Sequence, residues 1–124
     1  PLHTIVQGDR IRMRAPIQFA EGTPILLGTS HDALRELALL LGMNPDWRLL
    51  VEGHTDNRGN ADTLKGLSSQ RARAVVDFLI ANKVAPDRLR SDGIGGANPT
   101  TTNRTEDGRR ANNRIEIFIV HAGR

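Results

Sequence analysis

Residues 115–120 alternate strictly, with isoleucine at every second position. Such an alternation predicts a strand with one buried face, because successive side chains of a strand point to opposite sides. The stretches 10–15 and 47–52 alternate in the same way, and a further short strand is expected at 88–91. A chain with several strands of this kind must build a sheet and cover one face of it.

Two stretches between these strands have helical periodicity. Residues 34–41 place leucine and alanine on one helical face, with Ser30 as the expected N-cap and Gly42 as the expected C-terminal stop. A longer helix is expected to end near Ala81, with Asn82 as its C-cap. The predicted order is β-α-β-α-β-(loop or short helix)-β, and strands separated by helices need crossover connections. We therefore predict an α/β fold, an α+β sandwich in which helices pack on a mixed sheet.

The length of 124 residues predicts a single domain over residues 1–124. Its 38% hydrophobic and 25% charged residues are typical of a globular domain, and no apolar run approaches the roughly 18 residues that a membrane helix needs. The absence of cysteine excludes disulfides and thiolate metal sites. The chain opens at Pro1 without a secretion leader, so we expect that a leader was removed or that further segments precede it.

A glycine-rich stretch at 93–96 superficially suggests a phosphate-binding loop. No Lys-Ser or Lys-Thr pair and no helical pattern follow it, so a tight turn is the better interpretation. Residues 97–108 are polar and poor in apolar anchors, and we expect a surface loop there.

Two charged residues stand out as candidates for a binding site. Asp56 follows the strand at 47–52, and Arg71 lies on the flank of the core face of the longer helix. If Ser68 is the N-cap, Arg71 opposes the helix dipole by about 0.3–1 kcal/mol, which a bound anion would offset. This argument weakens if the helix starts near Asp62. From the residues alone, an ordinary ion pair that braces the loop against the helix is an equally good interpretation.

Several motifs in a fixed order resemble the OmpA-like domain family, and the resemblance covers about residues 9–120. The residues that carry it are Val51–Gly59 (VEGHTDNRG), Leu67–Ala72 (LSSQRA) with Val75, Gly93–Gly95 with Pro99 and Asn103, and Gly108-Arg109 with Asn112 and Arg114–Glu116.

The resemblance implies non-covalent binding of peptidoglycan through its diaminopimelate residue, by a non-enzymatic domain without a cofactor. Asp56 would receive the ammonium group of diaminopimelate, and Arg71 would bind its carboxylate with two parallel hydrogen bonds. Backbone amides of the loop that includes Thr55 and Asn57 would assist. Each exposed contact contributes roughly 0–1 kcal/mol, so we expect millimolar to micromolar affinity, about 4–8 kcal/mol. The resemblance also implies a periplasmic location, tethering to the outer or inner membrane through parts outside this chain, and a capacity to form homodimers.

Two departures from the family pattern leave a second function open. Relatives usually carry Asn at the position of Leu64 and an arginine pair where this chain has Asn113 and Arg114. Arg114 is the expected replacement cation, with Arg109 and Arg110 as alternatives. Lost or weakened wall binding would leave a protein-interaction or assembly module of an envelope machine.

Three other functions are not expected. His54 shows no ligand spacing with the other histidines, so it is expected to shape its loop by hydrogen bonding and not to hold a metal. Nucleic acid is not expected as a partner, because aromatic residues make up 3% of the chain and tyrosine is absent. Residues for a catalytic triad cannot be assembled, so no enzyme is predicted.

Overall fold

The computed structural model describes residues 2–121, so residues 1 and 122–124 of the predicted 1–124 domain lie outside the described part. The chain has two short 3-10 helices, Gly28–Ser30 and Pro86–Arg88. The elements follow in the order β1 (Thr4–Gln7), β2 (Arg10–Met13), α1 (His31–Met43), β3 (Trp47–His54), α2 (Ala61–Ala81), β4 (Leu89–Gly95), α3 (Glu106–Asn112) and β5 (Arg114–His121).

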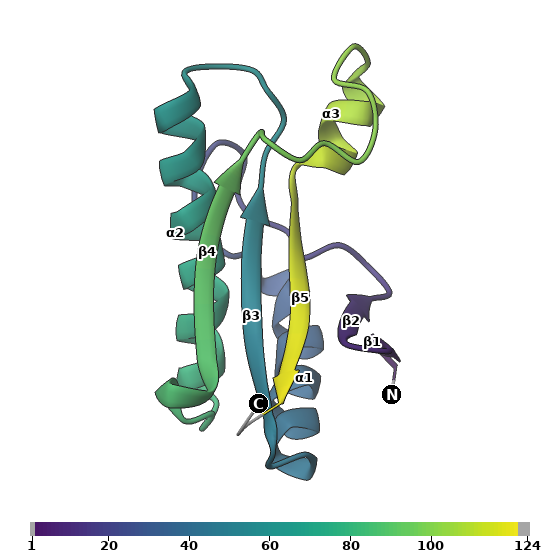
Figure 1. Cartoon of the computed structure of the whole chain (residues 1–124), viewed down its shortest axis with the longest axis vertical. Coiled ribbons are helices and arrows are strands. Elements are labelled where there is room, and N and C mark those ends of the chain that lie inside the picture. The colour runs from purple at the N-terminus through teal and green to yellow at the C-terminus, as the bar shows by residue number, and fades with distance from the viewer. Residues whose placement is uncertain (1, 122–124) are drawn as a thin grey trace.

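The five strands form one mixed sheet in the order β1-β2-β5-β3-β4. β3 and β4 are parallel, whereas β5 runs antiparallel to both β2 and β3, and β1 runs antiparallel to β2. Figure 1 shows α1 and α2 on the far face of the sheet and α3 at one end of it. The predicted α/β fold, with helices packed on a mixed sheet, is confirmed.

The core lies between the sheet and the two long helices. The leucines expected on one face of α1, Leu34, Leu37 and Leu41, are fully buried. β3 and β5 contribute alternate residues, as their patterns predict, and burial of each large apolar side chain stabilises the fold by about 1.5–3 kcal/mol. The facing residues of α2 are Ala72, Val75, Val76 and Leu79.

The predicted order of elements lacks β1, and this is the main error in the predicted strands. It pairs with β2 from Thr4 opposite Met13 to Gln7 opposite Arg10. Only Thr4 of its four residues is buried, so no apolar alternation marks the strand in the sequence. β2 is also shorter than the predicted strand at 10–15.

The predicted start of α1 is confirmed in position, and its predicted end is wrong. Ser30 is the N-cap residue, but its Oγ accepts a hydrogen bond from the N–H of Gln18 at 2.8 Å and makes no cap bond. Gly42 does not stop the helix, which continues through Met43 to a C-cap at Asn44. The side chain of Asn44 donates to a carbonyl in the last turn and closes the helix in place of glycine.

α2 begins well before Ser68, at Ala61. The side chain of Asn60 accepts hydrogen bonds from two backbone N–H groups of the first turn, which makes it the N-cap. Arg71 therefore lies inside the helix, and the dipole argument based on a Ser68 cap does not apply. Asn82 is the C-cap, as predicted. No helix within residues 2–121 is both long and apolar enough to cross a membrane.

β4 continues to Gly95, so the predicted tight turn is confined to the end of the glycine-rich stretch, where Gly95 has a φ of 64° and Gly96 lies in a turn. Gly93 of this stretch and Gly53 of β3 allow α2 to lie very close to the sheet. A Cβ at Gly93 would lie 2.1 Å from Oγ of Ser69, and a Cβ at Gly53 would lie 2.1 Å from the carbonyl oxygen of Ser68. Neither position has room for a side chain.

The surface loop expected at 97–108 is shorter than predicted, because α3 begins at Glu106. Thr105 is the N-cap of α3, and its hydroxyl accepts a hydrogen bond from the N–H of Gly108 at 3.0 Å. The buried side chain of Asn112 holds the preceding loop, because it bonds to backbone groups of Thr100 and Thr101.

Candidate functional site

The carboxyl ends of β3 and β4 meet the beginning of β5 at one edge of the sheet. His54 at the end of β3 pairs with Gly95 of β4 and with Arg114 of β5. The loop of residues 55–60 leaves the sheet at this edge and leads into α2, at the same end of the molecule as α3 (Figure 1). Loops at the carboxyl ends of strands commonly carry binding groups.

Asp56 is held at this edge by a residue from the end of α3. Its backbone N–H donates to Oδ1 of Asn113 at 2.9 Å, and its Oδ2 accepts from Nδ2 of Asn113 at 3.1 Å. Its Oδ1 accepts from the backbone N–H of Arg58 at 2.9 Å. The carboxylate is therefore oriented by hydrogen bonds to neutral groups and remains half-exposed.

Arg71 projects from α2 and is held by the segment that precedes α1. Its Nε donates to the carbonyl of Thr23 at 2.9 Å, and its guanidinium carbon lies 5.1 Å from the centroid of the Phe19 ring. Burial lowers the pKa of Arg71, and the negative charge of Asp56 raises it. The effect of burial is the larger one, so the pKa is lowered, but Arg71 stays charged at neutral pH because the ordinary pKa of a guanidinium lies far above neutrality.

Asp56 and Arg71 are close enough for their charges to interact, but they are not bonded to each other. The ion pairs within 4.0 Å among residues 2–121 do not include this one. The two Nη groups of Arg71 make no hydrogen bond within the described part of the chain. The arrangement thus presents an anion and a cation whose charges interact, each fixed by other partners and each with unused hydrogen-bonding capacity.

The predicted loop residues Thr55 and Asn57 have different environments. Thr55 is buried, its N–H donates to the carbonyl of Gly95 at 3.0 Å, and its hydroxyl donates to the carbonyl of Asp56 at 2.8 Å. Thr55 therefore joins the loop to β4, and its side chain is not presented to solvent. Asn57 is exposed beside Asp56.

Arg114, the expected replacement cation, is engaged within the protein. Its Nε bonds to Glu116, its Nη1 donates to the carbonyl of Asn112 at 3.1 Å, and its Nη2 donates to the carbonyl of Asn98 at 2.9 Å. All three nitrogens are used within the protein, and the bond from Nη2 holds the loop before α3 against β5. This arrangement leaves Arg114 little capacity to contact a ligand.

The alternative cations are also accounted for. Arg109 donates to the carbonyl of Asn103 at 3.0 Å, and Arg110 is exposed and pairs with Glu106 and Asp107 within α3. Among these arginines and Arg71, Arg71 is the one whose pKa is affected by the charge of Asp56.

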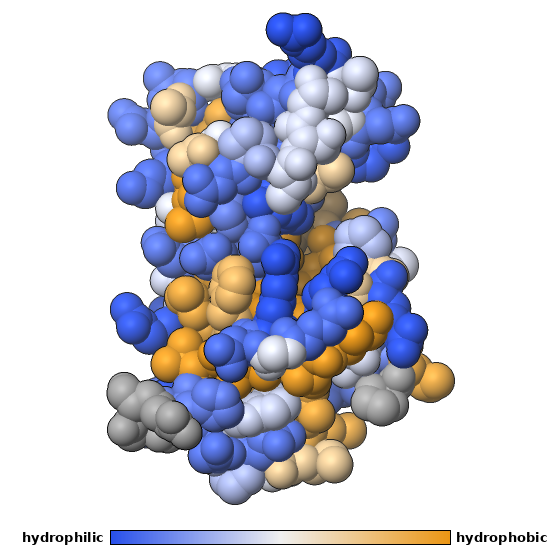
Figure 2. Space-filling model, turned by 45° about the vertical axis from the view of Figure 1, so that its right-hand side comes forward, coloured by the Kyte–Doolittle hydropathy of each residue, from blue (hydrophilic) through white to orange (hydrophobic). Residues whose placement is uncertain are grey.

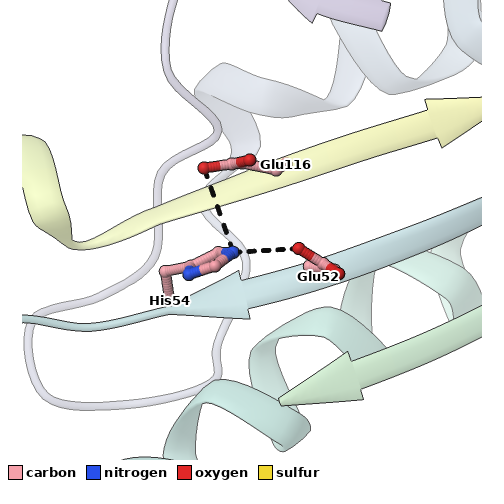
Figure 3. A group of neighbouring side chains, drawn as sticks. All are labelled: Glu52, His54 and Glu116. Atoms are coloured by element: carbon pink, nitrogen blue, oxygen red, sulfur yellow. Dashed lines mark hydrogen bonds and ion pairs between the residues drawn. The ribbon is translucent and has the colours of Figure 1, made fainter. Parts of the chain in front are cut away.

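Figure 3 shows a second cluster on the face of the sheet opposite α1 and α2, formed by Glu52, His54 and Glu116. His54 belongs to β3 and is buried, whereas the sequence predicts it as the first residue of the loop. Its Nε2 lies 3.1 Å from Oε1 of Glu52 and 3.9 Å from Oε2 of Glu116. One ligand atom of each residue lies within 4.8 Å of the others, a spacing that a metal ion could use.

The arginines around Glu116 favour an ion-pair cluster over a metal site. Arg10 lies 3.2 Å from one carboxylate oxygen of Glu116, and Nε of Arg114 bonds to the other. Two guanidinium groups beside the same carboxylate would repel a bound cation. His54 therefore bonds to Glu52 beside this ion-pair cluster. The expectation that it shapes the loop is wrong, because it belongs to β3.

Two residues that orient the site are not identified by the sequence pattern. In the sequence, Asn113 is noted only because relatives usually carry arginine at this position. In the structure it holds Asp56 through two hydrogen bonds. Ser68 is considered in the sequence only as a possible helix cap, but its buried hydroxyl accepts from the N–H of Gly95 at 3.0 Å and donates to the carbonyl of Lys65 at 2.8 Å. The contacts of Asn113 with Asp56 and of Ser68 with Gly95 join segments that are far apart in the chain.

Comparison with known proteins gives relatives over most of the chain. The peptidoglycan-binding protein ArfA of Mycobacterium tuberculosis is 38% identical over 84% of this chain, and the probable lipoprotein YiaD of Escherichia coli is 35% identical over 90% of it. The chain spans only 32% of the length of ArfA and 52% of the length of YiaD. It therefore matches one part of each longer protein.

Solved structures share the fold at lower sequence identity. The periplasmic domain of Helicobacter pylori MotB superposes with a TM-score of 0.80 at 23% identity, covering 95% of this chain and 87% of that one. The peptidoglycan-associated lipoprotein from Burkholderia pseudomallei gives a TM-score of 0.76 at 23% identity, covering 87% of this chain and 90% of that one. The model of the OmpA family matches residues 18–114, which include both Asp56 and Arg71. The chain therefore belongs to the OmpA family.

Proposed function

We propose that this chain binds peptidoglycan non-covalently through the diaminopimelate residue of the stem peptide, and so anchors an envelope protein to the cell wall. The observation that carries the proposal is the pairing of Asp56 and Arg71 as unbonded neighbours of opposite charge. Diaminopimelate carries an ammonium and a carboxylate at one end. Such a zwitterion can bridge the two side chains and complete the hydrogen bonds that each still lacks.

The environment of each side chain supports these roles. Asp56 keeps its orientation without a charged partner, so its charge is available to an ammonium group. The Nε of Arg71 is used by Thr23, which fixes the plane of the guanidinium and leaves both Nη groups for a carboxylate. Ligand binding to side chains that are already oriented loses less conformational entropy.

The similarity to ArfA, which is named for binding peptidoglycan, and to the peptidoglycan-associated lipoprotein supports the same function. The proposed role is binding without catalysis, in the periplasm, with attachment to a membrane through parts outside this chain. Weak individual sites are sufficient, because the wall presents many copies of the ligand.

The engagement of Arg114 favours a second candidate function. An arginine that is fully bonded within the protein cannot compensate for the altered family positions. In this alternative, the domain keeps the fold, has lost wall binding and acts as an assembly module of an envelope machine.

Pull-down with purified sacculi tests the proposal. We expect Asp56→Asn and Arg71→Leu each to reduce bound protein about tenfold, because each removes one charge of the pair. The matched control is Arg73→Leu, which removes an exposed arginine of the same helix that pairs with Asp77. Sacculi with lysine in place of diaminopimelate should bind less protein, because lysine lacks the second carboxylate.

The outcomes separate the two candidates. If both site variants bind sacculi as the unmodified protein does, Asp56 and Arg71 are not the site. If the unmodified, folded protein does not bind sacculi of either type, the assembly module becomes the better interpretation.

A further inference from the structure

A groove opens between β2 and β5 where their pairing stops. The two strands pair at Arg10 with Phe118 and at Ile11 with Ile117, and the N–H of Ile119 donates to the carbonyl of Asp9. Continuing this register would pair Met13 with Ile115, but the ladder ends before that position. In Figure 1, β1 and β2 turn away from β5, which leaves the first part of β5 without a neighbour on that side.

The backbone groups along this groove are unpaired between the two strands. In an antiparallel ladder, alternate residues direct their N–H and C=O groups toward the same neighbour. Ile119 directs its N–H toward β2, so Ile115 does the same. The N–H of Arg14 donates to His3 of the β1 side, so Met13 directs its groups toward β5. An exposed strand edge of this kind is a template for another strand.

The side chains give the groove an apolar floor and a basic rim. It has a volume of about 270 Å³. Ile11, Ile17 and Ile115 form part of the floor, and Arg10, Arg12 and Arg114 form the rim. Figure 2, which brings this side of the molecule forward, shows apolar surface in a hollow at mid-height beside long hydrophilic side chains.

The charge of the rim favours an anionic occupant. Glu116 is the single carboxylate of the lining and already faces Arg10 and Arg114. Arg12 is exposed, and its side chain makes one hydrogen bond within residues 2–121, to the side-chain oxygen of Gln7 at 3.4 Å. Arg14 is exposed just beyond the strand. The groove therefore has an excess of positive charge that its own carboxylate does not neutralise.

We propose that this groove binds an extended acidic segment of a partner protein, which adds as a strand along β5 at Ile115. The backbone of the segment would bond to the free groups of Ile115, its apolar side chains would face the isoleucine floor, and its carboxylates would meet Arg12, the rim arginine that is not paired with Glu116. Such strand addition obtains affinity from main-chain hydrogen bonds and specificity from alternate side chains. The groove is distinct from the pair formed by Asp56 and Arg71, so both can be occupied together.

The test uses a fluorescent, acetylated peptide in which glutamate and valine alternate. Fluorescence anisotropy should show saturable binding, and NMR should show shifts of the backbone amides of Ile115 and Met13. Arg12→Glu should weaken binding at least about tenfold, because it replaces attraction with repulsion at the rim. Arg73→Glu makes the same charge change on α2 and should leave the affinity unchanged.

Two further probes can overturn the proposal. A peptide of the same sequence that is N-methylated at alternate residues cannot donate the strand hydrogen bonds and should bind at least about tenfold more weakly. Equal binding of this peptide, or equal binding of a sulfated polysaccharide, would mean that the arginines attract any anion and that no strand is added. Absence of saturable binding by the unmethylated peptide would also overturn the proposal.

Discussion

Asn113 holds Asp56 through two hydrogen bonds, one to its backbone N–H and one to its carboxylate. The two residues are 57 positions apart in the chain. Asn113 follows α3, whereas Asp56 follows β3. The orientation of the carboxylate therefore depends on the folded arrangement that brings these two segments together.

This relationship predicts a loss of wall binding when Asn113 is shortened. Asn113→Ala should reduce binding to sacculi about threefold to tenfold, because Asp56 loses two hydrogen bonds of about 0.5–1.5 kcal/mol each that orient it. Thermal unfolding should change little, because both side chains are partly or fully exposed. Asn98→Ala, at an exposed position whose carbonyl alone is used, is the matched control. If Asn113→Ala and Asn98→Ala bind sacculi equally well, the hydrogen bonds from Asn113 to Asp56 do not contribute to wall binding.

Because α2 lies very close to the sheet, adding a single methyl group at Gly53 should strongly destabilise the fold. Gly53→Ala should lower the free energy of unfolding by about 1–3 kcal/mol, because the new Cβ would lie 2.1 Å from the Ser68 carbonyl oxygen and backbone must move. Gly42→Ala should instead raise it by about 0.5–1 kcal/mol, because no atom lies within 4 Å of the new Cβ and alanine favours a helix. Denaturant unfolding of both variants measures the difference.

The lowered pKa of Glu36 predicts how the free energy of unfolding depends on pH in acid. Burial by itself would raise the pKa of Glu36, but the Thr4 hydroxyl and the backbone N–H groups of Leu2, His3 and Thr4 outweigh it and lower the pKa to about 2. Because folding lowers this pKa, the stabilisation is present above the unfolded value of 4.5 and is lost as the pH falls toward 2. Unfolding at several pH values should therefore show a shallower acid slope for Glu36→Gln. The exposed Glu21→Gln should keep the slope of the unmodified protein.

Arg88 joins the end of α1 to the start of β3 and predicts a stability change without a binding change. Its Nη2 donates to the carbonyls of Leu41 and Asn44, and its Nε donates to that of Trp47. Arg88→Ala should lower the free energy of unfolding by about 1.5–3 kcal/mol, because these carbonyls lose a charged donor.

Arg88 is distant in the fold from the edge that carries Asp56, because it precedes β4 and that edge lies at the end of the strand. Sacculus binding of the folded variant should therefore match that of the unmodified protein. Arg90→Ala, at an exposed position of β4, should change neither property. A folded Arg88→Ala protein that no longer binds would contradict this separation.

The regular elements were predictable where burial imposes a period on the residues. Alternation identifies β3 and β5, and leucine spacing identifies α1, because each buries one face against the core. β1 has a single buried residue, so no period marks it. Gly93 and Gly95 resemble turn residues, but the space they leave is occupied by α2, and local sequence does not contain that information.

For the candidate site, the sequence points to the two charged residues but not to the groups that orient them. Asp56 and Arg71 stand out from their places after a strand and on a helix, together with the family resemblance. The partners that orient them, Asn113 and Thr23, are neutral groups whose roles depend on contacts between distant segments. The engagement of Arg114 is likewise a tertiary property.

The antiparallel pairing of β3 with β5 also determines how the domain would carry a mechanical load. His121 pairs with Trp47 at the start of β3, so β5 ends at the pole of the molecule opposite Asp56. A pull applied between Asp56 and His121 would slide the two strands past each other along their length. Their hydrogen bonds would then have to rupture together and not one after another, as in unzipping. We expect single-molecule pulling between these two points to need more force than pulling between Trp47 and His121.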